Sequence, residues 1–187
     1  MGSVSRRGLF LGLGSAAASG LFGPRAFATI ARSLTLPVLV GSSSSIMVIS
    51  ALAAESHFEE LGRRRRVVTD TRVRVEETLA KGGSVERELM VRTLGGSIGR
   101  LGELVHGQAR LRMGEQCVAF LLKGPDGLHY VNGMAQGHYP LSSEKLRRLL
   151  MSPGMPKIVD YDHSAVKELV GTELGRAAAR IRELSKK

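Results

Sequence analysis

Ten consecutive residues, Val67 to Glu76, alternate between two kinds of side chain, and this pattern constrains the fold more than any other feature of the sequence. One set is apolar or β-branched and comprises Val67, Thr69, Thr71, Val73 and Val75. The other set begins with Val68 and continues with Asp70, Arg72, Arg74 and Glu76. Successive side chains of a β-strand point to opposite faces, so a period of two predicts a strand with one face in a core and charges on the other.

The segments on either side of this strand predict partners for it. A Gly-rich turn at 81–84 leads to a second strand at 86–94, and the short spacing favours an antiparallel hairpin. Upstream, the near-continuous apolar run 45–55 has the length of a buried strand, although periodicity alone leaves a helix open.

A second predicted hairpin follows further along the chain. The apolar segment 114–122 is predicted to be a buried strand, 124–127 a tight turn and 128–135 the returning strand. Strands recurring with turn signals between them are typical of an all-β barrel or sandwich. We therefore expect residues 45–141 to form a mainly β domain, a small antiparallel OB-like β-barrel.

The C-terminal part, 142–187, has helical rather than strand periodicity. Leu141 to Met151 begins with serines suited to a helix cap and stops at Pro153, which predicts one helix. Residues 162–187 place apolar side chains at helical spacing and predict a longer amphipathic helix. The other face of that helix is a basic strip formed by Lys167, Arg176, Arg180, Arg182, Lys186 and Lys187.

The first 28 residues have the three-part organisation of an export signal. Arg6 and Arg7 precede a Gly-, Ala- and Leu-rich run, and Ala26-Phe27-Ala28 forms a small-residue cleavage site. The arginine pair after Ser5 resembles the twin-arginine signal. That resemblance implies export of a folded protein through the Tat translocase to the periplasm or another extracytoplasmic site. An ordinary secretion signal and an uncleaved anchor remain alternatives, and 29–44 is a lead-in with one short apolar helix or turn.

Charge and cysteine content narrow the classes of partner. The formal net charge of +10 falls to +7 without residues 1–28, because that segment holds Arg6, Arg7 and Arg25 and no acid. A basic protein favours anionic surfaces such as lipid head groups or acidic glycans. Nucleic acid is a less favoured partner, because the chain has 4% aromatic residues and no Trp. The lone Cys117 allows no intramolecular disulfide and, within an apolar strand, is predicted to be a buried thiol.

The glycine-rich stretch Gly95 to Gly107 raises the question of a phosphate-binding loop. Such a loop needs a helix directly after it, whereas Gly102 and Gly107 interrupt the residues that follow. We therefore predict a connection over one end of the barrel, no nucleotide and no other cofactor. The candidate binding loop residues are Gly95, Gly96, Gly99, His106, Gln136 and His138.

The sequence contains no motif that indicates a catalytic site or a metal site. The histidines lack the close spacings that metal ligands require, and no nucleophile motif occurs, so we predict no metal and no catalytic residue. One alternative stays open, in which Glu103, His106 and His138 come together as the site of a hydrolase.

Three segments resemble a family of exported bacterial proteins. They are VVTDTRVRVEETL, the stretch from MVRTLGGS to CVAFL, and YVNGMAQGHYPL, which together cover about Ser44 to Leu141. The shared pattern is V-R-T-x-G-G, then a glycine-punctuated loop and G-M-A-Q-G. The strand order is also similar to netrin-like OB barrels, which include secreted protease inhibitors. Those inhibitors engage a metal through an N-terminal Cys that this chain lacks, so the similarity implies fold alone.

Together these features predict a non-enzymatic binding or structural module of the cell envelope, with the glycine loop as its recognition surface. The alternatives are an envelope enzyme of hydrolase type and, less favoured, an OB-type nucleic-acid binder. An integral membrane span is not expected.

The export signal can be tested directly. Replacing both Arg6 and Arg7 with lysine is expected to leave the precursor in the cytoplasm, because the translocase recognises the arginine pair itself. Fractionation of producing cells, with immunodetection of the chain, measures its location. Wild-type accumulation of the double variant outside the cytoplasm would contradict the twin-arginine interpretation.

Overall fold

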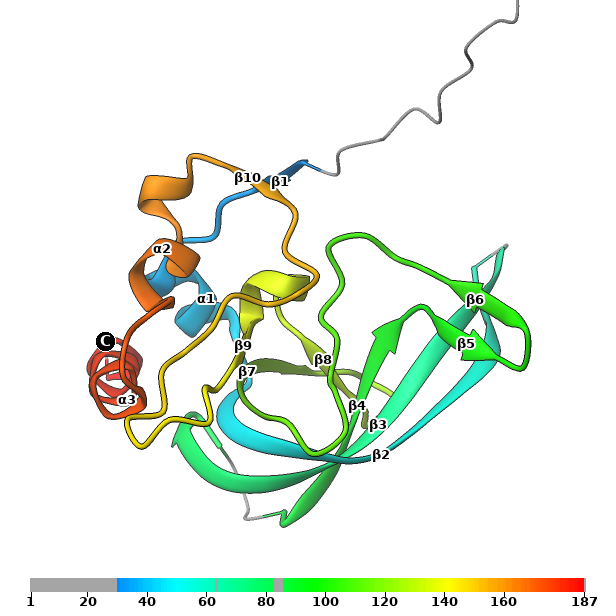
Figure 1. Ribbon diagram of the computed structural model, residues 1–187, viewed down its shortest axis with the longest axis horizontal. Helices are drawn as coiled ribbons and strands as arrows, with labels where there is room; N and C mark the ends of the chain where they lie inside the picture. The colour runs from blue at the N-terminus through cyan, green and yellow to red at the C-terminus, as the bar shows by residue number, and fades with distance from the viewer. Residues whose placement is uncertain (1–29, 63, 83–85, 187) are drawn as a thin grey trace, which may run out of the picture.

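The computed structural model describes residues 30–62, 64–82 and 86–186 (Figure 1). The predicted export signal lies outside the described residues, and its named members are Arg6, Arg7, Ala26 and Ala28.

The described chain is mainly β, with short helices near both of its ends. Its elements in order are β1 (Ile30–Arg32), α1 (Leu36–Ser42), β2 (Ser45–Leu61), β3 (Arg64–Ala80), β4 (Glu88–Leu94), β5 (Gly96–Ile98), β6 (Leu101–Glu103), β7 (Gln116–Lys123), β8 (His129–Val131), the 3-10 turn η1 (Met134–Gly137), β9 (His138–Pro140), β10 (Lys157–Val159), the 3-10 turn η2 (Tyr161–His163), α2 (Ala165–Leu169) and α3 (Leu174–Ser185). The predicted mainly β fold with C-terminal helices is confirmed.

The main sheet has six strands in the order β2-β3-β4-β8-β7-β9, and β7 pairs with β2 as well. The long strands β2 and β3 form an antiparallel hairpin, and β3 pairs in turn with β4, as the sequence predicted. Register shifts in β2, such as the one between Ala51 and Ala53, allow the strand to bend. Figure 1 shows β2 and β3 sweeping together from the helices at one end to the β5–β6 hairpin at the other.

The prediction of a purely antiparallel barrel is wrong, because the sheet is mixed. β4 and β8 run parallel and pair only through Val91 with His129 and Arg92 with Tyr130. The pairings pass around β2, β3, β4, β8 and β7, and an odd number of strands cannot alternate direction all the way round. One pair of neighbouring strands must therefore be parallel. Because that pair, β4 and β8, is joined through only two residue pairs, the sheet is not a closed barrel.

The alternation that defined β3 appears in its burial. Thr71 and Val73 are buried, whereas Arg72 and Arg74 are exposed. Val68 departs from the prediction, because it is buried although it lies on the charged face.

Two cores share the strands β2 and β7. One set of residues from these strands, including Ile46, Val48, Val118 and Phe120, packs against the helices. The alternate set, including Met47, Ile49, Cys117, Ala119 and Leu121, packs inside the curled sheet with Val73 and Val91. Both faces of β2 and β7 are therefore buried, which explains why their sequences are continuously apolar. Cys117 is buried as predicted.

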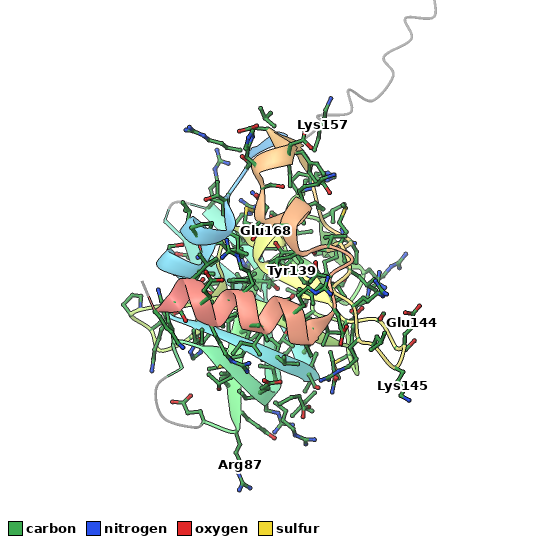
Figure 2. The ribbon with its side chains drawn as sticks, turned by 90° about the vertical axis from the view of Figure 1, so that its left-hand side faces the viewer. Arg87, Tyr139, Glu144, Lys145, Lys157 and Glu168 are labelled. Carbon is green, nitrogen blue, oxygen red and sulfur yellow. The ribbon has the colours of Figure 1, made fainter. Side chains whose placement is uncertain are left out.

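The helices cover the outer face of the sheet. The short apolar helix predicted in the lead-in is α1, and its Leu36, Leu39 and Val40 lie in the same core as α3. Figure 2 shows α3 lying across the sheet, and β1 pairs with β10, which ties the lead-in to the C-terminal segment. No helix in the described part of the chain is long and apolar enough to cross a membrane.

Two helix predictions at the C-terminus are wrong in detail. Residues 141–151 form no helix, because their backbone amides bond to distant carbonyls; the amide of Leu149, for example, donates to Thr172 O at 2.9 Å. The predicted single helix over 162–187 is divided into α2 and α3 at Gly171, where φ is +83°. A glycine adopts that left-handed conformation without strain and ends the first helix.

Candidate functional site

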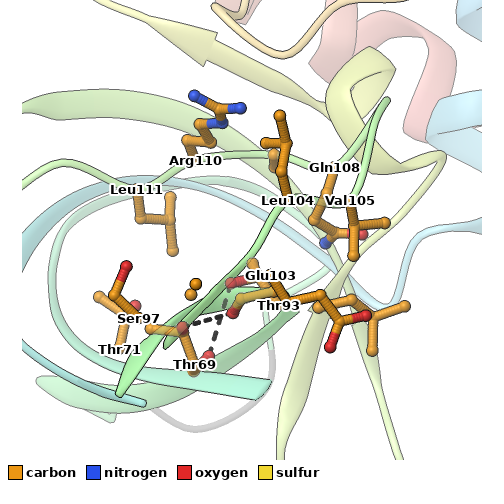
Figure 3. Close-up of a pocket in the computed structure, with 15 residues that line it drawn as sticks. Thr69, Thr71, Thr93, Ser97, Glu103, Leu104, Val105, Gln108, Arg110 and Leu111 are labelled. Atoms are coloured by element: carbon orange, nitrogen blue, oxygen red, sulfur yellow. Dashed lines mark hydrogen bonds between the residues drawn. The ribbon is translucent and has the colours of Figure 1, made fainter. Parts of the chain in front are cut away.

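A pocket of about 500 Å³ lies where the inward faces of β3 and β4 extend beyond the core of the curled sheet. Its other walls come from the β5–β6 hairpin and from the loop after it (Figure 3). The lining residues are Thr69, Thr71, Thr93, Leu94, Gly95, Gly96, Ser97, Gly102, Glu103, Leu104, Val105, Gln108, Ala109, Arg110 and Leu111.

Polar side chains replace apolar ones where the inward faces reach the pocket. Along β3 the inward sequence runs from Val73 to Thr71 and Thr69, and along β4 from Val91 to Thr93. Thr69 and Thr93 are directly opposite one another in the register. The core of the sheet thus ends in a floor of hydroxyl groups.

Three polar side chains of the lining have little solvent exposure and make at most one weak hydrogen bond within the described chain. Thr71 is 1% exposed, while Thr93 and Gln108 are each 8% exposed. Among the described residues, the side chains of Thr71 and Gln108 have no hydrogen-bond partner, and Thr93 Oγ1 reaches only Thr69 O, at 3.5 Å. None of the three holds a fully buried polar atom that lacks a partner; among the described residues such atoms belong to Ser45, Glu115, His129, His138 and Tyr139. The free donors and acceptors of the lining therefore open into the pocket, where a ligand can reach them.

Thr69, by contrast, is used to hold the glycine stretch in place. Its Oγ1 donates to Gly95 O at 2.6 Å and lies 2.8 Å from Ser56 Oγ. Gly96 rests directly on this pair, and a Cβ there would overlap both oxygens. The absence of a side chain at Gly96 is therefore what lets β5 lie against β2 and β3.

The glycine-rich stretch is the predicted connection, organised as a small hairpin. β5 and β6 pair from Gly96 with Glu103 to Ile98 with Leu101, and Gly99 occupies the turn with φ of +59° and open space around it. The element that follows β6 in the described chain is the strand β7 and not a helix, so the arrangement that cradles a phosphate at a helix N-terminus is not formed here.

The carboxylate of Glu103 holds this hairpin against β3, and we call its two hydrogen bonds the Glu103 latch. Glu103 accepts hydrogen bonds from Arg66 Nε and, at 2.8 Å, from the backbone amide of Val67. These two bonds, first the backbone one and then that from Arg66, hold the pKa of Glu103 below its ordinary value. The carboxylate is therefore ionised at neutral pH and accepts one hydrogen bond at each oxygen.

The structure places the predicted binding-loop residues in different surroundings. Gly95 and Gly96 line the pocket, whereas Gly99 and His106 lie outside its lining, His106 being exposed. Gln136 uses its amide within the fold, accepting from Leu34 N and donating to Arg32 O, both at 2.9 Å.

His138 is a core residue of the described chain. It is 1% exposed, its Nδ1 lies 2.9 Å from Ser152 Oγ, and burial lowers its pKa to about 4. The open alternative of a site built from Glu103, His106 and His138 gains no support, since Glu103 is bonded to Arg66 and Val67, His138 is buried beside Ser152, and His106 is exposed. The described residues contain no cluster of potential metal ligands either.

Several residues that provide the polar groups of the pocket were not predicted as site residues from the sequence. Thr69 and Thr71 were assigned to the inward face but treated as core residues, although inward threonines at a strand end could have indicated a polar cavity. Gln108 carries no local signal, because its loop reaches the pocket only in the folded chain. Arg66 lies outside the lining and acts through its bond to Glu103.

The latch makes the hairpin sensitive to pH. Because the pKa of folded Glu103 lies below the ordinary value of 4.5, its carboxylate stabilises the docked hairpin above that pH, and the stabilisation is lost as the pH falls through the lowered pKa. Hydrogen-exchange protection of the β5–β6 amides should therefore fall as the pH drops below about 4.5.

In Glu103→Gln, protection should be weaker near neutral pH and should no longer change over this range. Glu144→Gln, in an exposed loop, is the matched control and should behave as wild type. An unchanged pH profile in Glu103→Gln would show that the latch does not hold the hairpin.

No family model matches the chain, and no curated protein matches it either. Function therefore has to follow from the geometry of the pocket.

Proposed function

We propose that the protein is an exported, non-catalytic binding module of the cell envelope, and that the pocket beneath the β5–β6 hairpin is its ligand site. The observation that carries the proposal is a group of polar side chains that open into the pocket and make at most one weak bond within the described chain, Thr71, Thr93 and Gln108. Polar groups of a cavity that make few bonds within the protein are free to bond with a ligand.

The architecture belonging to this proposal is an OB-like, partly open barrel. The order of pairing around β2, β3, β4, β8 and β7, with β7 returning to β2, supports it. The parallel β4–β8 contact is the weak seam of that ring. Beyond Arg92, β4 continues without a β8 partner, while β3 stays paired with β2 along its length. The pocket lies at the ends of these two strands, and such openings in small barrels commonly receive ligands.

The extracytoplasmic location rests on the export signal, with the Tat translocase as the partner during export. The positive charge that remains after the signal, +7, suits an environment of anionic surfaces. The pocket itself contributes little to this attraction, so general charge and specific recognition are separate properties of the molecule.

The ionisable groups of the lining favour binding over catalysis. Glu103 is held ionised by Arg66 and Val67, with its pKa moved away from neutrality rather than toward it. A general acid or base works best with a pKa near the operating pH. Arg110, the other charged member, points away from the threonines (Figure 3).

The proposal predicts that filling the pocket abolishes binding to envelope material. Ser97 is exposed and lines the pocket mouth, so Ser97→Trp should occupy the space without disturbing the core. Co-sedimentation of the full chain with isolated cell envelopes, at about 0.15 M salt to screen general charge attraction, measures the affinity. We expect saturable binding by wild type and at least about a ten-fold loss in Ser97→Trp.

The control is Val38→Trp, a substitution at a site on α1 that is 53% exposed and outside the lining. It adds the same ring to the surface and should leave binding unchanged. Equal binding by all three proteins would show that the pocket is not the ligand site.

A further inference from the structure

We propose that the pocket binds a neutral acetamido sugar, a ligand that carries hydroxyl groups and one acetylated amine. This inference rests on the proposed function of the pocket as a ligand site and names the chemistry of the ligand. It follows from the charge of the lining, the hydrogen-bonding groups of the floor and the aliphatic wall.

The ligand should be neutral because the pocket offers no free counter-charge. The carboxylate of Glu103 is already bonded to Arg66 and to the amide of Val67, and Arg110 is exposed with its guanidinium directed away from the floor. A charged ligand group placed among the threonines would lose its hydration without gaining an opposite charge, which is costly. Neutral polar groups escape that penalty.

The floor matches hydroxyl and amide groups in particular. Thr71 and Thr93 provide hydroxyls that can donate and accept, and Gln108 provides an amide with one acceptor and two donors. An acetamido group presents the complementary donor and acceptor, while ring hydroxyls can bond with the threonines. Thr71, Thr93 and Gln108 can thus each form a hydrogen bond with a hydroxyl or an amide group of the ligand.

The remaining wall is aliphatic and suits the apolar parts of such a sugar. Leu94, Val105 and Leu111 line it, together with the more exposed Leu104. An acetyl methyl and the C–H face of a sugar ring can contact these side chains and leave water. A ligand with hydroxyls all round would leave this wall unmatched.

An extended peptide is a less suitable neutral ligand. Peptides that add to a sheet need a free strand edge with unpaired backbone groups. At the pocket, Thr93 of β4 pairs with Thr69 of β3, the amide of Gly95 donates to Val67 O, and β5 pairs with β6. The β8-facing edge of β4 has strand partners only at Val91 and Arg92, which leaves a stretch of two residues toward the pocket, too short for an extended peptide to add as a strand. The pocket recognises its ligand through side chains instead.

The affinity for a single sugar should be weak. The described residues that line the pocket include no aromatic ring, so stacking adds nothing to the hydrogen bonds. We expect a dissociation constant on the order of 1 mM for one sugar unit, which an NMR titration can follow.

The test is a titration of the isotopically labelled full chain with N-acetylglucosamine, glucose and glucuronic acid. N-acetylglucosamine should shift the amide signals of Thr71, Thr93 and Gln108 saturably. Glucose, which lacks the acetamido group, and glucuronic acid, which is charged, should each bind about ten-fold or more weakly.

Matched variants on one strand locate the binding. Thr71→Val removes only the hydroxyl and should weaken N-acetylglucosamine binding about three- to ten-fold. Thr78→Val makes the same change at an exposed position of β3 outside the pocket and should have no effect.

Equal binding of glucose and N-acetylglucosamine would overturn the acetamido assignment, and tighter binding of a capped neutral tetrapeptide would assign the pocket to peptides. If no sugar binds while Ser97→Trp still abolishes envelope binding, the sugar inference fails and the proposed function stands. If Ser97→Trp has no effect on envelope binding, the proposed function fails as well.

Discussion

The burial of both faces of β2 and β7 is the constraint on which the rest of the structure depends. Alternate residues of these strands enter two different cores, with Ile46 and Phe120 on the helical side and Ile49 and Leu121 inside the curled sheet. The helices cannot be removed without exposing one face of each strand, and the curl cannot open without exposing the other. Each layer therefore stabilises the next through strands that belong to both.

Because β2 and β7 supply much of both cores, the inward positions of β3 and β4 beyond Val73 and Val91 are not needed to complete the core. Their inward residues Val73 and Val91 complete the core, and the next inward positions are threonines that face a cavity. The β5–β6 hairpin is held over this cavity by the Glu103 latch and by the close approach of Gly96. A well-packed scaffold thus carries a site in which some polar side chains make no hydrogen bond within the described chain. Such a combination is expected where function competes with stability.

Much of the fold could be predicted from local patterns. The alternation around Val73 identified β3 and its inward face, and the apolar run at Cys117 identified a buried strand. The short parallel contact between β4 and β8 could not be foreseen, because it follows from the number of strands around the sheet rather than from either sequence. The helix expected over 141–151 failed for a similar reason, since long-range backbone bonds overrode local propensity.

The candidate site was predicted only in part. The glycine spacing indicated a connection that begins at Gly95, and Gly95 and Gly96 line the pocket in the structure. His138 and Gln136 were attractive residues by type, yet both form bonds within the fold. Gln108 and the Arg66–Glu103 pair required the three-dimensional structure, since the partners are brought together by the folding of the hairpin onto β3.

The central claim is that the hydroxyl of Thr71 is kept for a ligand and contributes nothing to the folded state on its own. Chemical denaturation of ligand-free Thr71→Val tests this most directly, because valine keeps the shape of the side chain and removes only its polar atom. We expect a free energy of unfolding within about 1 kcal/mol of wild type, because the hydroxyl opens into the pocket and has no hydrogen-bond partner in the described part of the chain. A loss of more than about 1 kcal/mol would show that the hydroxyl is bonded within the fold and would contradict the account.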